Sequence, residues 1–172
     1  VKCINAYNEK IKNGALEQEA MNEVFATSRD NSRTPMQWDS SKNAGFTDGI
    51  PWIKVNNNYK FINVANEEKD ENSILSFYKK LIKLRKTNET LIYGNYDLIL
   101  EDDEKIFAYK RTLGDEKYII MANLSEDKRE YNHKEEKLKY ENLVLNNYEV
   151  EKHDEITRFK MKPYECRVYK II

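Results

Sequence analysis

Apolar residues recur at helical spacing within residues 4–26, near the start of the chain. The apolar positions are Ile4, Tyr7, Ile11, Ala15, Leu16, Ala20, Met21, Val24 and Phe25. Spacings of three and four residues place such side chains on one face of a helix, and the pair Asn13-Gly14 between them favours a turn. The pattern predicts two short amphipathic helices joined by a turn.

A second helical pattern covers residues 73–87. Its apolar positions are Ile74, Leu75, Phe77, Tyr78, Leu81, Ile82 and Leu84. Asn72 or Ser73 can cap the N-terminus with a side-chain oxygen, while basic residues gather toward the C-terminus, where the helix dipole favours positive charge. This segment predicts an amphipathic helix whose apolar stripe must pack against another element.

The period of the apolar pattern changes to two after Tyr93-Gly94. Segments with this pattern cover residues 96–100, 105–111, 117–123, 143–145, 158–161 and 166–171. They are short, rich in β-branched and aromatic residues, and bounded by acidic, Gly or Asn residues. Leu113–Glu116 is typical of a hairpin turn, and Pro163-Tyr164 of a bend before the last strand. The closely spaced strands predict an antiparallel β-sandwich.

Two further segments show no sustained period. Residues 27–71 are punctuated by Pro, Gly, Asn and Asp, with a predicted turn at Asn56–Asn58. A loop of this length is uncommon inside a compact domain and usually has a function. Residues 125–141 are charged and poor in apolar residues, so they predict a solvated loop or an edge strand and not a binding site.

Composition and charge narrow the class of protein. The 172 residues are 40% hydrophobic, which suffices for a core, and 29 basic against 30 acidic residues leave a net charge of -1 without a basic face for nucleic acid or a membrane. Cys3 and Cys166 lack metal-ligand spacing, which predicts free thiols and no metal or cofactor. These features favour a cytoplasmic globular protein, and a start at Val1 inside a helical pattern indicates a fragment.

The candidate chemistry lies in the segment Ser28–Trp38, which reads SRDNSRTPMQW. It concentrates guanidinium groups, a carboxylate, amides and an indole in a stretch without secondary-structure period, as loops that form sugar pockets do. A loop-stabilising ion pair is the alternative role for Arg33. Arg29 and Asp30 could line the pocket or hold the loop together through its own backbone hydrogen bonds. Trp38, Phe46 and Trp52 could stack on sugar rings, but large aromatic residues in loops more often anchor them, and we favour packing.

Several motifs in order resemble one family. They read SRDNSRTPMQW, NAGFTDGIPWI, NYKFINV, SFYKKLIKLRK, IYGNYDLIL, KIFAYKR, MANLS and KPYE. Over essentially its whole length the chain resembles the C-terminal part of the α-glucosidases of glycoside hydrolase family 13, the α-amylase superfamily. Within that family it is similar to the branch that contains oligo-1,6-glucosidase and trehalose-6-phosphate hydrolase.

The resemblance implies an α+β chain with two parts. Residues 1–92 would be the helical and loop tail of a (β/α)8 barrel, namely the loop after its eighth strand and its last helix. Residues 93–172 would be an antiparallel, all-β C-terminal sandwich domain. By position, Arg33 matches the family arginine that binds the non-reducing glucose and pairs with an acidic residue of an early barrel loop, and Arg29 is a second substrate-binding candidate.

No catalytic residue is assigned in this chain. The family carries its nucleophile Asp, acid/base Glu and third Asp on earlier barrel strands, and no motif here corresponds to them. The carboxylates of residues 67–71 precede a helix, where the dipole alone favours them. His133 and His153 lie in charged stretches without a nucleophile signature. The resemblance therefore implies an α-glucosidase part that contributes to the pocket but is inactive without the missing barrel domain.

We considered two other functions from the sequence. A free-standing carbohydrate-binding or interaction module would need an exposed aromatic platform, and Tyr93, Tyr96, Tyr109 and Tyr169 alternate as core or hairpin residues do, which predicts none. A purely structural domain would not need both arginines. The preference for α-1,6, α-1,4 or trehalose-6-phosphate linkages depends on upstream loops, and the apolar stripe of helix 73–87 allows self-association.

Overall fold

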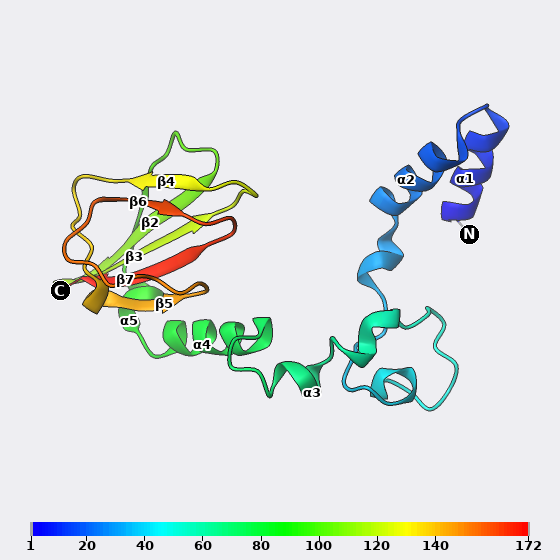
Figure 1. Cartoon of the computed structure of the whole chain (residues 1–172), viewed down its shortest axis with the longest axis horizontal. Coiled ribbons are helices and arrows are strands. Elements are labelled where there is room, and N and C mark those ends of the chain that lie inside the picture. Colours follow the sequence, from blue (N-terminus) through cyan, green and yellow to red (C-terminus); the bar gives the residue numbers. More distant parts are fainter. Residues whose placement is uncertain (1, 172) are drawn as a thin grey trace. The chain divides into compact units, whose positions relative to one another are not determined.

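The structure, a computed structural model, describes residues 2–171, apart from the side chains of Lys2 and Asn31. The described chain forms two compact units, one that ends at Asp70 and one that begins at Glu71. Figure 1 shows helices and irregular loops in the first unit, and strands with further helices in the second.

The first unit begins with the two predicted helices, α1 (Lys2–Lys12) and α2 (Glu17–Thr27). Gly14 makes the turn between them with a φ of 86°, in the left-handed region that favours glycine. An ion pair between Lys10 and Glu23 links the two helices. The prediction of two short helices with a turn at Asn13-Gly14 is confirmed.

The rest of the first unit consists of single turns. They are η1 (Arg29–Ser32), η2 (Lys42–Gly45), η3 (Asn57–Lys60) and the short helix α3 (Val64–Glu67). The side chain of Asn56 accepts a hydrogen bond from the Asn58 amide at 3.4 Å, which confirms the turn predicted there. Helix α3 was not predicted, because four residues are too few to reveal a period of 3.6.

The second unit contains two antiparallel sheets. Their strands are β1 (Asn95–Ile99), β2 (Ile106–Leu113), β3 (Glu116–Asn123), β4 (Arg129–Asn132), β5 (Leu143–Asn146), β6 (Arg158–Met161) and β7 (Cys166–Ile171). The large sheet has the order β1-β2-β3-β7-β5, and β4 pairs with β6 in the small one. Leu113 pairs with Glu116 across a turn in which Gly114 has a φ of 58°, so the predicted hairpin is confirmed.

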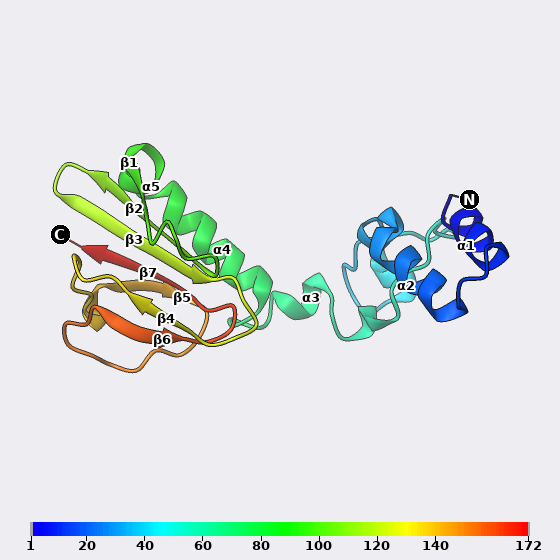
Figure 2. The same ribbon diagram turned by 90° about the horizontal axis from the view of Figure 1, so that it is seen from above.

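The large sheet is the middle layer of the second unit. On β3, Ile119 and Met121 face a core that includes Tyr131, Leu138 and Met161 from the side of the small sheet. The alternate residues of β3 face the opposite way, toward helix α4 (Ile74–Lys86). Figure 2 shows the small sheet and α4 on opposite faces of the large one. Because side chains alternate along a strand, the large sheet contributes side chains to a hydrophobic core on each of its two faces.

Helix α4 is fixed to the sheet by apolar and polar contacts, and it confirms the helix predicted at residues 73–87. Its inward side chains Phe77 and Leu84 pack on a buried cluster of Leu91, Tyr118, Leu145 and Val168. The Ser73 hydroxyl accepts from the Ser76 amide at 3.1 Å and caps the helix. Each large apolar side chain buried in this way contributes about 1.5–3 kcal/mol. The following short helix α5 (Glu89–Tyr93), which was not predicted, supplies Leu91 to the same cluster.

The sequence predicted a solvated loop or an edge strand for the charged segment 125–141, but in the structure part of this segment is buried. Residues Arg129–Asn132 form β4, which pairs only with β6, so the edge-strand alternative is right for them. Tyr131 and Leu138 are fully buried. Burial also raises the pKa of the Tyr131 hydroxyl far above its usual value. A few core residues spaced among many charges leave too weak a pattern to predict burial.

A buried ion pair stabilises the turn before β7 and explains the KPYE motif. One carboxylate oxygen of Glu165 accepts from the Lys162 amide at 2.6 Å, and the other accepts from Arg167 Nε at 2.7 Å. The Arg167 guanidinium also lies 4.3 Å from the centre of the Phe159 ring. Because both charges are buried, removal of either partner would leave the other without compensation.

Replacement of Gly94 by Ala should strongly destabilise the second unit. A Cβ at this buried position would lie 2.5 Å from the Thr90 carbonyl oxygen and 2.9 Å from that of Thr112, so backbone would have to move. We expect a loss of about 2–3 kcal/mol in urea unfolding followed by far-ultraviolet circular dichroism.

The matched control is Gly114→Ala. Its Cβ would meet nothing within 4 Å, and only its positive φ is unfavourable, so we expect a loss of about 1 kcal/mol. Equal losses in the two variants would contradict the proposed close approach at Gly94.

Candidate functional site

The two candidate arginines lie on one tight turn, which we call the arginine turn (Ser28–Arg33). The Ser28 hydroxyl accepts from the Asp30 amide at 3.4 Å, and the Ser32 hydroxyl donates to the Arg29 carbonyl at 3.0 Å. The Arg33 amide donates to the Asp30 carbonyl at 3.1 Å. Serine hydroxyls thus satisfy the local backbone, as the composition of the segment favours.

Both guanidinium groups are exposed. Among the described residues, no side chain forms an ion pair or hydrogen bond with Arg29 or Arg33. Each group therefore keeps its planar set of N–H donors available for a hydroxyl or carboxylate. The structure brings the two predicted substrate-binding residues together on one turn. A loop-stabilising ion pair, the alternative role considered for Arg33, is not formed within the described residues.

The segment that follows the arginine turn folds back on itself through its backbone. The Trp38 amide donates to the Ala44 carbonyl at 2.9 Å, and the amides of Val64 and Ala65 donate to the carbonyls of Gln37 and Trp38 at 2.9 and 3.0 Å. The Gln37 side chain also donates to the carbonyl of residue 62. These bonds give an otherwise irregular segment a defined shape.

A left-handed run at Asn43, Ala44 and Gly45 shapes the tip of this segment. Their φ angles are 55°, 58° and 66°, and Ala44 is fully buried. The Asn43 side chain donates to the Thr47 and Gly49 carbonyls, both at 2.8 Å, which offsets part of the strain. Sequence reasoning missed this run, although Asn43 and Gly45 are both of residue types that tolerate a positive φ.

Asp39 supports the same tip from the other side. Its carboxylate accepts from the Ser41 hydroxyl at 2.5 Å and from the Ser41 amide at 2.8 Å, and these hydrogen bonds hold the pKa of Asp39 below its usual value. A Cβ on Gly45 would lie 2.9 Å from both carboxylate oxygens. Glycine is therefore required at position 45 for both its conformation and its size.

The aromatic side chains of this segment do not anchor it within the described chain. Trp52 is 85% exposed, Trp38 is 51% exposed, and Phe46 is also exposed. Within the described chain these side chains are not packed against other elements, and the packing role that we favoured from the sequence stays a prediction. Exposed aromatic residues are suited to contact a sugar or another part of a protein.

The histidines and cysteines have structural surroundings. His153 Nε2 lies 3.2 Å from the Tyr169 hydroxyl, and His133 Nε2 lies 3.8 Å from a Glu135 oxygen. Cys3 and Cys166 are free thiols, and burial raises the pKa of Cys166. Within residues 2–171, no three His, Cys, Asp or Glu side chains cluster to hold a metal ion, and no helix is long and apolar enough to cross a membrane.

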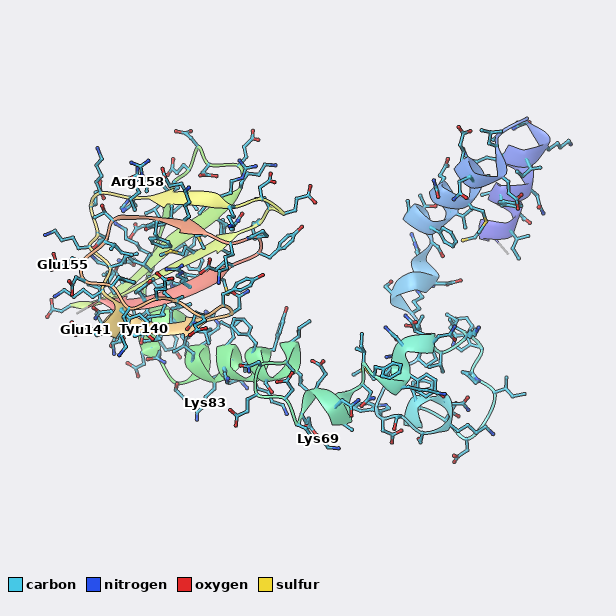
Figure 3. The ribbon with its side chains drawn as sticks, viewed as in Figure 1. Lys69, Lys83, Tyr140, Glu141, Glu155 and Arg158 are labelled. Atoms are coloured by element: carbon cyan, nitrogen blue, oxygen red, sulfur yellow. The ribbon has the colours of Figure 1, made fainter. Side chains whose placement is uncertain are left out.

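A polar depression on the second unit is a weaker candidate. It has a volume of about 520 Å³, and Figure 3 shows Tyr140, Glu141 and Glu155 close together in this region. Glu155 pairs with Lys137 at 2.9 Å and with Lys139 at 3.5 Å, and these lysines lower its pKa. Because the charges compensate each other at the surface, the depression shows no group prepared for a ligand.

The chain belongs to the α-amylase family. Residues 3–94 match the family of the alpha amylase catalytic domain, and residues 96–168 match the maltogenic amylase C-terminal domain. The family resemblance and the mixed fold expected from the sequence are thereby confirmed, with a catalytic-domain part followed by an antiparallel C-terminal domain.

Similar proteins are glucosidases and related hydrolases. The oligo-1,6-glucosidase of Parageobacillus thermoglucosidasius is 46% identical, over 99% of this chain and 31% of its own length. The trehalose-6-phosphate hydrolase of Bacillus subtilis (strain 168) is 35% identical over the same shares. A crystal structure of the Bacillus licheniformis trehalose-6-phosphate hydrolase matches with a TM-score of 0.87 at 38% identity, over 99% of this chain and 31% of that one. The chain spans less than a third of these relatives and aligns with a C-terminal part of them.

Replacement of Gly45 by Ala should disrupt the tip of the loop. The new Cβ would meet the Asp39 carboxylate and would hold an unfavourable φ, at a cost of about 1–3 kcal/mol. Both tryptophans of the chain lie in this segment, so we expect a shifted emission maximum and faster acrylamide quenching.

The matched control is Gly49→Ala, in the same loop. Its Cβ would meet only the Thr47 hydroxyl oxygen, at an ordinary 3.6 Å, and its φ is not positive. Its fluorescence should match that of the unmodified chain. An unchanged spectrum in Gly45→Ala would argue against the left-handed run.

Proposed function

We propose that this chain is the C-terminal part of a cytoplasmic α-glucosidase that hydrolyses α-linked glucosides, as oligo-1,6-glucosidases do. Residues 1–92 would complete the barrel domain and carry the arginine turn to the substrate pocket, and residues 93–172 would form the supporting β-domain. The observation that carries the proposal is the pair of exposed, unpaired guanidinium groups of Arg29 and Arg33, in a chain 46% identical to an oligo-1,6-glucosidase.

Arg33 would bind the non-reducing glucose. A guanidinium presents a planar fork of donors that can hydrogen-bond a sugar hydroxyl while it pairs with a carboxylate from the upstream part of the enzyme. Arg29, on the same turn, would reach the sugar or the surrounding loop. The loop after them, which is held by its own backbone hydrogen bonds, would support the turn rigidly. Such rigidity is what the positioning of a substrate requires.

The bond-breaking groups would come from outside this chain. A retaining glycosidase uses one carboxylate as nucleophile and a second as acid and base, about 5–5.5 Å apart. We assign no catalytic residue, metal or cofactor to these 172 residues. Their contribution would be to bind and orient the glucoside, without a nucleic acid or membrane partner.

Trehalose-6-phosphate hydrolase is the second candidate for the whole enzyme. The TM-score of 0.87 to such a hydrolase favours it, whereas the higher sequence identity favours oligo-1,6-glucosidase. The two candidates share the non-reducing glucose and differ in the leaving group. Assays of the whole enzyme with isomaltose and with trehalose-6-phosphate would separate them.

The 172-residue chain alone should not hydrolyse isomaltose, maltose or an aryl α-glucoside. It would lack both the nucleophile and the general acid that the reaction requires. Over days, glucose release should not exceed that of the same substrate in buffer without protein. Turnover that survives removal of contaminating host glucosidases would contradict the assignment of the catalytic groups to the upstream part.

In a full-length glucosidase that contains this chain, Arg33→Lys should keep the fold but lose about 2–4 kcal/mol of transition-state stabilisation. This corresponds to a fall of roughly 30- to 900-fold in kcat/KM. The loss should be similar for short α-glucosides of any linkage, because the contact is to the non-reducing glucose.

The control is Arg158→Lys, an exposed arginine of β6 that pairs with Glu130 at 2.8 Å. Figure 3 shows Arg158 on the second unit, whereas the arginine turn belongs to the first. Its kinetics should stay unchanged. A change of less than about threefold for Arg33→Lys, under 1 kcal/mol, would return Arg33 to a structural role.

A further inference from the structure

A hollow with an excess of positive charge lies in the second unit, at β6, β7 and the segment that links β5 to β6 (Figure 1). It has a volume of about 370 Å³, within the usual size range of small-molecule pockets. Its charged lining residues are the cations Lys152, Lys160, Lys162 and Arg167 and the acids Glu149 and Glu151. Cationic side chains therefore outnumber carboxylates by two around this hollow.

Arg167 is the buried member of this lining. Its side chain is only 9% exposed. Its Nε donates to Glu165 at 2.7 Å, and its Nη1 donates to the Tyr169 hydroxyl at 3.4 Å. Within the described chain no group accepts a hydrogen bond from Nη2, and protein does not fully enclose this nitrogen. Because a guanidinium carries five N–H donors, those of Nη2 are available to a ligand in the hollow.

The buried carboxylate beside Arg167 does not occupy the whole guanidinium. An arginine and a carboxylate often form two parallel hydrogen bonds, which take up two nitrogens. Glu165 instead uses one oxygen for Arg167 Nε and the other for the Lys162 amide, at 2.6 Å. The pair is thus neutral overall, but the terminal nitrogens of Arg167 are left to groups other than Glu165.

Three lysines add positive charge around this guanidinium. Lys152, Lys160 and Lys162 are exposed, and none of them forms an ion pair with another described residue. Glu149 and Glu151 line the same hollow but pair with none of these lysines. Exposed lysines alone are ordinary on a protein surface. Their grouping around a buried guanidinium with free donors is what distinguishes a binding site for an anion.

We propose that this hollow binds a phosphate group, either free or esterified to a small organic molecule. A phosphate ester carries up to two negative charges and three acceptor oxygens, so it can accept from a guanidinium and from several ammonium groups at once. Val150 and Ile156 also line the hollow and provide an apolar side for the organic part of an ester. The lining lies wholly within residues 71–172, so the proposal does not depend on the proposed function.

A neutral saccharide fits this hollow less well. Sugars stack on free aromatic faces, but the Phe159 ring that lines the hollow is in contact with Arg167, at 4.3 Å, and with the Tyr131 ring, at 5.1 Å between centres. The sequence predicted no exposed aromatic platform. Tyr93 and Tyr96 are exposed in the second unit, but neither lines the hollow. Charge, and not stacking, is therefore what the site offers.

Isothermal titration calorimetry of the full 172-residue chain tests the proposal. Glucose-6-phosphate and inorganic phosphate should each bind at one site per chain, whereas glucose, or sodium chloride at equal ionic strength, should not bind. At least tenfold tighter binding of glucose-6-phosphate would identify an ester as the occupant. Affinities within tenfold of each other would identify the phosphate group alone as the feature that is recognised.

Lys160→Gln should weaken the binding of both phosphates at least fivefold, because it removes one ammonium group from the hollow. The matched control is Lys83→Gln, which removes an exposed positive charge from α4 on the opposite face of the large sheet (Figure 2). Its affinity should change less than twofold. The pair separates a local contact from the general attraction of an anion to a positive charge.

Arg167→Lys tests the buried guanidinium. A lysine keeps a positive charge near Glu165 but lacks the planar set of donors, so phosphate binding should fall at least tenfold. Far-ultraviolet circular dichroism should match that of the unmodified chain. Phosphate should also raise the thermal unfolding midpoint of the unmodified chain, but not that of Arg167→Lys, because a ligand that binds the folded state stabilises it.

Two results would overturn the proposal. One is the absence of binding of either phosphate at millimolar concentration to the folded, unmodified chain. The other is an equal loss of affinity in Lys160→Gln and Lys83→Gln. Because Lys160 is exposed and makes no ion pair in the described chain, its replacement leaves the fold intact, and this comparison decides the outcome even if Arg167→Lys unfolds.

Discussion

The packing of α4 on the large sheet is the contact on which the second unit depends. The alternation of side chains on β3 and β7 gives the sheet two apolar faces, and one of them would be open to water without Phe77 and Leu84. The Tyr118 hydroxyl adds a 2.7 Å hydrogen bond to Asn88 just after the helix. This contact also joins two parts of the chain that match different family models, because α4 lies in the catalytic-domain match and the sheet in the C-terminal-domain match.

The first unit is held by a different kind of interaction. Backbone hydrogen bonds and the left-handed run Asn43–Gly45 give its loop a shape, while the side chains of Trp38, Phe46 and Trp52 stay exposed. A chain that buries so little apolar surface in this part gains little from the hydrophobic effect there. The arginine turn is therefore locally ordered by serine hydroxyls and is left with two free guanidinium groups.

Periodic elements could be predicted from the sequence, and short or strained ones could not. The helices at residues 2–27 and 74–86 and six of the strands follow their apolar patterns. Helices α3 and α5 are too short to show a period, and the apolar residues of β4 and its surroundings are spaced among many charges. The left-handed run depends on contacts of Asp39 and Asn43 that no pattern encodes. Arg29 and Arg33 were found through the family resemblance, because the pattern of apolar positions does not show which arginines bind a ligand.

Hydrogen exchange of the full chain, read by mass spectrometry, tests most directly whether α4 is part of the C-terminal unit. The amides of α4 should be protected to nearly the same extent as those of β3, because the helix cannot open without exposing the cluster around Tyr118 and Val168. Exchange of α4 as fast as that of residues 46–56, which have few backbone hydrogen bonds, would contradict the account.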